Sequence, residues 1–466
     1  MKISRRTALK TALAAGVTTS ATTHADNRTF NNSKHDDDFA LPAEPKDLLL
    51  NHSHAVEVMQ QEKVDLLLCS DPVNIYYLTN QQSVSDMIGM DGFVYAALSA
   101  SSERKPTFIG SQLGYYFDAP EQRVTDKLDL RFYSSPAEPE LFEKINKAVD
   151  LVAAEAAPGF MPKNHETSKQ SPLESKRLKQ VELAVSELSA SMEAAIVAEI
   201  LRSELPNKTI AVDNLRLGKI IERSGIDVRI VDGERLIRRI RLKKSATELE
   251  FMRYAAQANS LSGLRAAKAV REGANFRELR EEFWKQAGRQ MCNAKYLMLD
   301  THTPVLANGE IKNGRSFLID CVSEFQGYHG DYGRTVCVGE PNRKLKQVID
   351  TLSNVWDRIL PELRPGVAYS DIYTLANKLF AESKVDAGFA VNPHSVGLHH
   401  SDEPSAAEFS YFQKENLVLT ENMVLSVDMP VLDTGMGGTA HLEDLVLINK
   451  DGPELLNDTG NRFIVV

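Results

Sequence analysis

Residues 317–335 read FLIDCVSEFQGYHGDYGRT. The apolar run Phe317-Leu318-Ile319 ends at Asp320, and Asp331 follows eleven residues later, past Gly327 and Gly330. An apolar run bounded by turn-forming glycines is typical of a strand that enters a hairpin. A hairpin of this length can bring two carboxylates onto one face at a distance that a metal ion can bridge. Taken alone, two aspartates at this spacing would more often be surface or turn residues. Metal ligation by this pair therefore needs support from other residues of the chain.

Two more acidic residues, Asp428 and Glu443, lie in strand-like runs further along the chain. The runs are residues 423–430 (MVLSVDMP) and 440–448 (AHLEDLVLI), joined by a glycine-rich turn at 435–438. An acidic side chain inside an apolar strand is costly to bury unless it is paired or bound to a cation. No lysine or arginine lies between Asp428 and Glu443 to form a local ion pair. Metal ligation is therefore the favoured interpretation of this pair.

Histidines cluster in the same half of the chain. Residues 393–400 read PHSVGLHH, and six of the eleven histidines fall between His302 and His441. A single histidine is usually a satisfied polar residue, but a dense group beside acidic strand residues favours a metal or catalytic site. We therefore add His394 to the candidate ligands Asp320, Asp331, Asp428 and Glu443.

Length, composition and charge indicate which class of protein carries this site. A chain of 466 residues with 42% hydrophobic and 25% charged residues predicts a globular protein of two domains. A net charge of −10 argues against a nucleic-acid partner, which needs a basic surface. The four cysteines are dispersed and form no C-x-x-C pair, so neither a disulfide framework nor a thiolate zinc site is predicted.

The pattern of elements differs between the two halves. Alternating strands and helices predict an α/β layer at residues 46–236, with strands at 64–69, 92–98, 209–212 and 228–231 and one long helix at 178–205. Residues 237–466 are first helical and then strand-rich, which favours an α+β domain with helices packed on a curved antiparallel sheet. The helices are expected after the capping box Ser245-Ala246-Thr247-Glu248 and at 276–291, 345–360 and 370–383.

The amino terminus has the features of a targeting segment. Residues 1–25 carry a twin arginine, Arg5-Arg6, followed by a short weakly apolar stretch and the small-residue end Thr23-His24-Ala25. They resemble a twin-arginine export signal, which predicts a periplasmic protein; the alternative is a disordered basic tail. Residues 26–45 are polar and turn-rich and are expected to be a linker. No other segment approaches the ~20 apolar residues of a membrane span.

The carboxyl-terminal motifs, taken in order, resemble the pita-bread metallohydrolases, which include aminopeptidase P, prolidase, methionine aminopeptidase and the metal-free creatinase. The matching motifs are D-x-x-R-T at 331–335, a histidine before V-G-L at 394–398, an acidic residue after M-V-x-S-V at 423–428, and L-E-D-x-V-L-I at 442–448. Residues 74–79 (NIYYLT) resemble the creatinase-type amino-terminal domain. The resemblance implies an α+β fold: a pita-bread (creatinase/aminopeptidase) catalytic domain preceded by a smaller α/β creatinase-type domain.

The resemblance also implies roles for individual residues. Asp320 would chelate one metal ion, Asp331 and Glu443 would bridge two ions, and His394 and Asp428 would bind the second. His302 would be a substrate-binding histidine, and His400 a second one, with Ser401 as the alternative for that position. We expect two divalent ions, with Mn²⁺ first and Fe²⁺, Co²⁺ or Zn²⁺ as alternatives. The ions would activate a water for attack on a carbonyl and stabilise the oxyanion that develops.

The implied activity is a metal-dependent Xaa-Pro aminopeptidase or dipeptidase that acts on a small peptide or amide, as a homodimer. Two positions depart from the pattern of the hydrolytic peptidases: Asp428 replaces a glutamate, and His441 stands where an arginine is usual. Two alternatives remain open. One is a same-fold hydrolase or lyase of small amides or amidines, and the other is a metal-poor, non-peptidase homologue.

Overall fold

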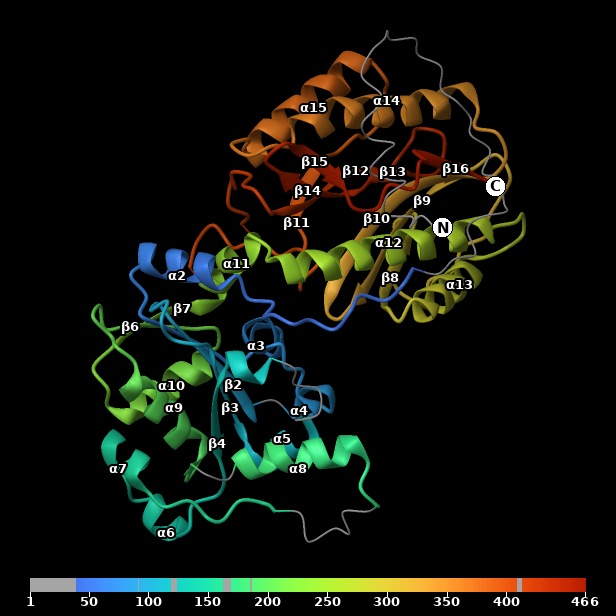
Figure 1. Cartoon of the computed structure of the whole chain (residues 1–466). Coiled ribbons are helices and arrows are strands. Elements are labelled where there is room, and N and C mark those ends of the chain that lie inside the picture. The colour runs from blue at the N-terminus through green and yellow to red at the C-terminus, as the bar shows by residue number, and fades with distance from the viewer. Residues whose placement is uncertain (1–38, 91, 119–123, 162–168, 185–186, 409–412) are drawn as a thin grey trace, which may run out of the picture. The chain divides into compact units, whose positions relative to one another are not determined.

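The computed structural model describes residues 39–466 apart from 91, 119–123, 162–168, 185–186 and 409–412 (Figure 1). The predicted export signal at 1–25 lies outside the described residues, as does the linker up to residue 38, so both stay predictions. Residues 39–45 form neither helix nor strand. Within the described part of the chain, no helix combines the length and the apolar character that crossing a bilayer requires.

The amino-terminal sheet has seven strands in the order β5-β4-β3-β2-β1-β6-β7. Strand β2 runs antiparallel to both of its neighbours, and the other pairs are parallel, so the sheet is mixed. The four strands that the sequence predicted are all present. The strands are β1 (Leu66–Cys69), β2 (Val94–Ser99), β3 (Thr107–Ser111), β4 (Asp129–Tyr133), β5 (Leu188–Ser189), β6 (Thr209–Val212) and β7 (Arg229–Asp232).

Helices accompany these strands, and one prediction about them is wrong. The expected single helix at 178–205 is two helices, α8 and α9, separated by β5. Ser191 begins α9 as its N-cap, with its side chain accepting a hydrogen bond from Ala194 N, while Leu188 pairs with Phe132 of β4. The helices are α2 (His52–Gln61), α3 (Pro72–Thr79), α4 (Val84–Met87), α5 (Gln112–Asp118), α6 (Pro139–Phe142), α7 (Ala148–Ala153), α8 (Pro172–Ala184), α9 (Met192–Arg202) and α10 (Leu215–Ser224).

The carboxyl-terminal sheet has nine strands and is antiparallel except for β16, which runs parallel to β10. Its main path is β15-β14-β12-β13-β10-β9-β8, with β11 paired to β12. The α+β prediction is confirmed. The strands are β8 (Asn293–Leu299), β9 (Ser316–Phe325), β10 (Tyr328–Cys337), β11 (Asn392–Ser395), β12 (Val424–Val431), β13 (Ala440–Glu443), β14 (Leu445–Asn449), β15 (Gly452–Leu455) and β16 (Phe463–Val465).

Four helices cover the two faces of this sheet. Helices α12 (Ala246–Lys268) and α13 (Phe276–Arg289) lie on one face, and α14 (Arg343–Ile359) and α15 (Tyr369–Ser383) lie on the other (Figure 1). All four were predicted to within a few residues. Helix α11 (Gly233–Leu242) leads into α12, and the predicted boundary between residues 236 and 237 falls inside it.

The β9–β10 hairpin is longer than the sequence predicted. Asp320 does not end its strand but sits in the middle of β9, paired with Gly333 of β10. Gly330 was expected in the turn and instead lies within β10. A Cβ at Gly330 would lie 2.4 Å from the carbonyl oxygen of Ala255, so this glycine permits the close approach of α12 to the sheet. The hairpin therefore holds its two aspartates on regular, buried strands.

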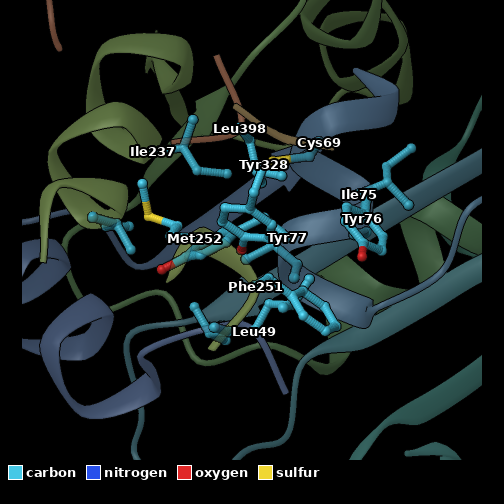
Figure 2. Close-up of a cluster of buried hydrophobic side chains, with 14 of the residues drawn as sticks. Leu49, Cys69, Ile75, Tyr76, Tyr77, Ile237, Phe251, Met252, Tyr328 and Leu398 are labelled. Carbon is cyan, nitrogen blue, oxygen red and sulfur yellow. The ribbon is translucent and has the colours of Figure 1, made fainter. Parts of the chain in front are cut away.

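Helix α12 begins as the sequence predicted. Ser245 and Glu248 form a capping box, in which each side chain accepts a hydrogen bond from the other residue's backbone N–H. Behind this cap, Figure 2 shows a buried cluster in which Tyr77 of α3, Met252 of α12 and Tyr328 of β10 lie together. Burial of these apolar side chains fixes the start of α12 against the hairpin that carries the two aspartates.

Glu248 gives a prediction for the dependence of stability on pH. The side chain is fully buried, and burial raises its pKa from 4.5 to about 7, although Lys244 and the hydrogen bonds from Ser245 and Tyr328 oppose the shift. Between these two values the folded protein binds a proton that the unfolded chain lacks, so stability falls as pH rises from 4.5 to 7. A difference of this size corresponds to roughly 3 kcal/mol.

Glutamine at this position cannot ionise. The substitution Glu248→Gln is therefore expected to be more favourable at pH 8 than at pH 5, measured as the difference in free energy of urea unfolding between variant and parent at each pH. A difference that stays the same at both pH values would contradict a raised pKa for Glu248.

Candidate metal centre

The strand register brings three of the predicted acidic residues onto one face of the sheet. Asp320 of β9 is opposite Gly333 of β10, and Gly333 is in turn opposite Glu443 of β13. Asp331 is two residues before Gly333 on β10, so its side chain points to the same face. Because side chains alternate along a strand, a slip of one residue in this hairpin would turn both aspartates to the opposite face.

The other two predicted ligands come from β11 and β12. Asn392 pairs with Asp428, and His394 pairs with Ser426, so His394 and Asp428 share one face by the same alternation. The Nε2 atom of His394 lies 3.4 Å from Oδ2 of Asp428, 3.6 Å from Oδ2 of Asp331 and 4.0 Å from Oε1 of Glu443. The structure thus brings all five residues together around one small volume.

Three overlapping groups in this cluster have the dimensions of metal sites. In each group the nitrogen or oxygen atoms that could ligate an ion lie within 4.8 Å of one another. Two of the groups also include His400 or His441. The groups are Asp331, His394 and His400; Asp320, His441 and Glu443; and His394, Asp428 and Glu443.

The burial of the carboxylates and the hydrogen bonds of their oxygens test whether these residues fit divalent ions. Asp331 is 0% exposed and Glu443 is 1% exposed. Among the described residues, no hydrogen-bond partner is present for Oδ1 of Asp320, Oδ1 of Asp331 or Oε2 of Glu443, although all three atoms are buried. Buried carboxylate oxygens are stable only when they are paired, protonated or bound to a cation. The donor set therefore fits divalent ions.

The electrostatics of the cluster lead to the same conclusion. Burial, together with repulsion from Asp331, raises the pKa of Asp320 to about 7. Burial and the charges of Asp331 and Asp428 raise the pKa of Glu443 well above its ordinary value. Burial also opposes the ionisation of Asp331, but contact with His400 holds the pKa of Asp331 below its usual range. So many carboxylates in one buried volume resist full ionisation unless positive charge compensates them.

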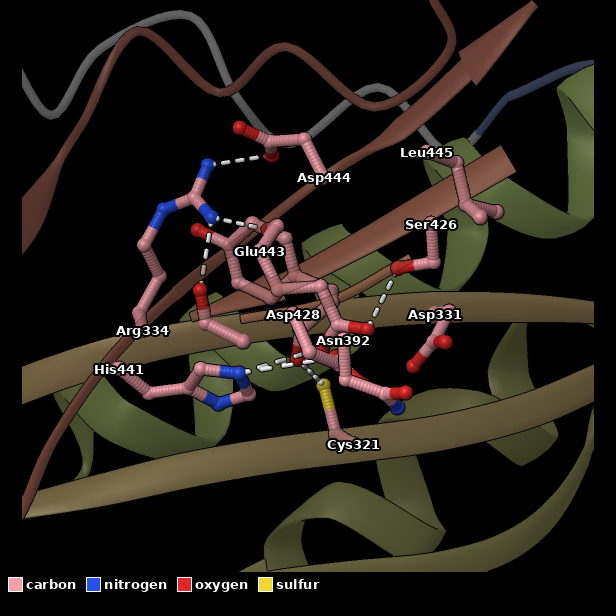
Figure 3. Close-up of polar contacts among 12 residues, drawn as sticks. Cys321, Asp331, Arg334, Asn392, Ser426, Asp428, His441, Glu443, Asp444 and Leu445 are labelled. Atoms are coloured by element: carbon pink, nitrogen blue, oxygen red, sulfur yellow. Dashed lines mark hydrogen bonds and ion pairs between the residues drawn. The ribbon is translucent and has the colours of Figure 1, made fainter. Parts of the chain in front are cut away.

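Several neighbours fix the orientation of the ligands. The hydroxyl of Ser426 donates a 2.6 Å hydrogen bond to Oε1 of Glu443, and Nδ2 of Asn392 donates to Oδ2 of Asp428 at 3.2 Å. On the opposite face, Arg334 forms a buried ion pair with Asp444 and also donates to the carbonyl oxygen of Glu443 (Figure 3). These contacts hold β13 against β10 and so restrict the position of Glu443.

The two predicted substrate-binding histidines lie in different places. His400 is at the cluster, with Nε2 3.0 Å from Oδ2 of Asp331, whereas Ser401 lines a separate cavity of about 570 Å³ together with Arg238. His302 is exposed in the turn after β8 and lines another cavity with Asp300 and Arg315, outside the three groups. The geometry thus separates His400 from its alternative Ser401 and does not bring His302 into the cluster.

The structure also places in the cluster two residues that were not named as candidate site residues: Tyr296, and His441, which was noted only as a departure from the peptidase pattern. The hydroxyl of Tyr296 on β8 lies 3.2 Å from Nε2 of His400. Burial and the nearby charges of Asp320 and Asp331 raise its pKa strongly, so the hydroxyl stays protonated. His441 reaches the cluster from β13, two residues before Glu443, and Figure 3 shows its ring directed toward Asp428. That departure, together with strand alternation with Glu443, could have identified His441 as a candidate ligand.

Comparison with known proteins gives matches of both sequence and fold. Residues 250–450 match the model of metallopeptidase family M24. An Xaa-Pro dipeptidase of Pyrococcus horikoshii is 25% identical over 238 residues, which cover 49% of this chain and 66% of that protein. A probable dipeptidase PepE of Mycobacterium tuberculosis is 29% identical over 160 residues, which cover 34% of this chain and 41% of that protein.

Solved structures match over most of the chain at low identity. The prolidase from Pyrococcus horikoshii superposes with a TM-score of 0.58 at 16% identity, covering 87% of this chain and 97% of that one. The X-Pro aminopeptidase from Thermotoga maritima gives a TM-score of 0.57 at 15% identity, covering 89% and 99%. The fold is therefore that of prolidases, with a mixed α/β domain followed by a pita-bread domain. The sequence match shows that residues 250–450 of this chain belong to metallopeptidase family M24.

Proposed function

We propose that this chain is a dinuclear-metal peptidase that cleaves short peptides at an Xaa-Pro bond. The observation that carries the proposal is the convergence of Asp320, Asp331, His394, Asp428 and Glu443 on one buried face, with carboxylate oxygens that lack partners within the described structure. The Xaa-Pro preference rests on the names of the relatives with similar sequences, three of which are named Xaa-Pro dipeptidases. The matched segment covers about two thirds of those relatives, so the substrate belongs to the proposal.

The positions of the candidate ligands indicate which ion each residue would hold. Two divalent ions, when bound, would supply a water of lowered pKa and stabilise negative charge on the carbonyl oxygen of the substrate. Glu443 belongs to two of the three groups, so it would hold both ions. Asp331 lies 3.6 Å from Nε2 of His394, and its charge also acts on Asp320, which supports the bridging role that the resemblance implies for it. We expect Mn²⁺, Fe²⁺, Co²⁺ or Zn²⁺, since all four accept mixed carboxylate and imidazole ligands.

His400 and Tyr296 are placed to contact the substrate. The side chain of His400 is 34% exposed, whereas the side chain of Asp331, its partner in the cluster, is fully buried. Its Nε2 atom lies within hydrogen-bond distance of both the Asp331 carboxylate and the Tyr296 hydroxyl. A histidine held in this way can donate a proton to, or hydrogen-bond, a substrate group that enters from solvent.

The test is metal-dependent cleavage of matched dipeptides. Purified protein, stripped with a chelator and then given Mn²⁺, Co²⁺ or Zn²⁺, is expected to release the amino-terminal residue from Met-Pro and Ala-Pro faster than from Met-Ala and Ala-Ala. The rate is expected to fall to background when the chelator is added again. Tight binding of metal without turnover of any proline dipeptide would overturn the proposed substrate while leaving the metal centre in place.

A second candidate function rests on one observation, the pair Asp428 and His441. These residues replace the glutamate and arginine that are usual in the hydrolytic peptidases, and both contact the cluster. A changed environment at this point would suit hydrolysis of a smaller amide or amidine instead of a peptide. Turnover of such small amides by the metal-loaded protein, with none of the proline dipeptides, would favour this function.

A further inference from the structure

His441 occupies a space that a glycine leaves open. A Cβ at Gly333 would lie 2.4 Å from both Nδ1 and Cε1 of the His441 ring, so only glycine at 333 permits this position of the imidazole. Gly333 lies between Asp320 and Glu443 in the strand register, and the ring is therefore inserted between two candidate ligands. The side chain packs into the metal centre and not into the apolar core.

The ring of His441 is buried without hydrogen-bond partners. The residue is 2% exposed, and within the described structure neither Nδ1 nor Nε2 makes a hydrogen bond. Only its backbone is satisfied, through N–H and C=O contacts with the hydroxyl of Thr335. A structural histidine in a protein interior normally uses at least one ring nitrogen in a hydrogen bond. A buried imidazole whose nitrogens make no hydrogen bond is costly unless it binds something else.

The surroundings of Nε2 identify the partner as a cation. This atom lies 3.7 Å from Oδ1 of Asp428 and 3.8 Å from Oε2 of Glu443. Both distances are too long for a hydrogen bond but suit two ligands of one ion, because ligands at about 2.0–2.2 Å from a metal lie roughly 3–4 Å apart. His441 also forms with Asp320 and Glu443 a group whose ligand atoms are mutually within 4.8 Å.

Asp428 lies on the side of the cluster that His394 serves. It forms a group with His394 and Glu443, and the amide of Asn392 donates a hydrogen bond to its Oδ2. Aspartate also reaches one methylene less far than the glutamate that the similar peptidases have at this position. The position beside Asp320 and Glu443 is therefore left for the imidazole that enters from β13.

We propose that His441 is itself a metal ligand, completing with Asp320 and Glu443 one of the two ion positions while His394 serves the other. The inference rests on the proposed dinuclear metal centre. It gives each ion one imidazole, and nitrogen ligands shift preference from Mn²⁺ toward Zn²⁺, Co²⁺ and Fe²⁺. It thus revises the first expectation from the sequence, in which only His394 supplied nitrogen.

The test is a direct measurement of metal binding that does not use activity. The parent protein, His441→Gln and the control His54→Gln are each stripped of metal and titrated with Co²⁺, followed by visible absorption and by counting bound ions. His54 lies on α2 and contacts Glu57, so it controls for the loss of a histidine elsewhere. We expect two tightly bound ions in the parent and the control. In His441→Gln we expect one ion to bind as before and the other at least about 10-fold more weakly.

A second measurement on the parent protein does not depend on how the variant folds. Zinc-edge X-ray absorption of the fully loaded parent is expected to show about one imidazole per zinc, whereas His394 alone would supply about one imidazole for every two zinc ions. Two equally tight ions in His441→Gln, with unchanged imidazole scattering, would overturn the role of His441 alone. Failure of the parent to bind any metal would overturn the proposed function as well, so the two failures are distinguishable.

Discussion

Replacing Asp331 by asparagine is expected to abolish metal-dependent hydrolysis while leaving the fold intact. Asp331 is 0% exposed and lies at the centre of β10, with Oδ2 3.0 Å from His400 Nε2 and 3.6 Å from His394 Nε2. Asparagine has almost the same shape but carries no charge, and its nitrogen cannot act as a ligand. Because Asp331 is a proposed ligand of both ions, its loss would remove the stabilisation that they supply. We expect kcat to fall on the order of 10³-fold or more, equivalent to roughly 4 kcal/mol.

Thermal unfolding provides a second measurement for the same variant. Added metal is expected to raise the Tm of the parent protein, because a ligand that binds only the folded state stabilises it. The Asp331→Asn variant should keep a metal-free Tm close to that of the metal-free parent and lose most of the increase. The matched control is Asp350→Asn on α14, an exposed aspartate that contacts Lys346 and should keep both metal binding and turnover. Full turnover by Asp331→Asn would remove Asp331 from the metal centre.

The parts of the fold that the sequence predicted are those with local causes. The capping box at Ser245 depends on residues within one helical turn, and the strand at 66–69 depends on its own apolar run. Apolar residues at helical spacing likewise predicted the helices α12 to α15. Such features need no knowledge of distant parts of the chain, and the structure has them within a few residues of the expected limits.

The errors come from positions where a distant contact overrides the local pattern. Glycine is a turn former in general, so Gly330 was expected in the turn of the hairpin. In the structure Gly330 lies within β10, where its missing side chain makes room for α12. The helix expected at 178–205 is broken in the same way, because Leu188 pairs with β4.

The candidate site was predicted better than its surroundings. Asp320, Asp331, His394, Asp428 and Glu443 stood out because charged residues rarely occur inside apolar strands without a reason. Tyr296 did not stand out, since tyrosine is common in strands, and His441 was noted only because it stands where the similar peptidases have an arginine, not as a ligand. Their importance follows only from the register that places β8 and β13 on either side of the β9–β10 hairpin.

The largest effect on stability is expected at a buried ion cluster beside the metal centre. Asp402 is 0% exposed and accepts hydrogen bonds from Nη2 and Nε of Arg241, at 2.7 and 3.2 Å, while Lys244 Nζ lies 3.7 Å away. Arg241 also donates to the side chain of Asn74, so the cluster joins α11 and α3 to the loop that carries His400. These charges hold the pKa of Asp402 well below its ordinary value, although burial opposes this.

The substitution Asp402→Ala leaves Arg241 and Lys244 buried without their carboxylate. Breaking one partner of a buried ion pair typically costs about 3–5 kcal/mol, because the remaining charge has lost its compensation. The matched control is Glu415→Ala, since Glu415 also lies between two arginines of α11, at 2.8 Å from Arg235 and 2.6 Å from Arg239, but all three side chains are partly exposed. Removing it should cost about 1 kcal/mol or less. Urea unfolding of both variants measures the difference, and equal losses of stability would show that burial does not strengthen the Asp402 cluster.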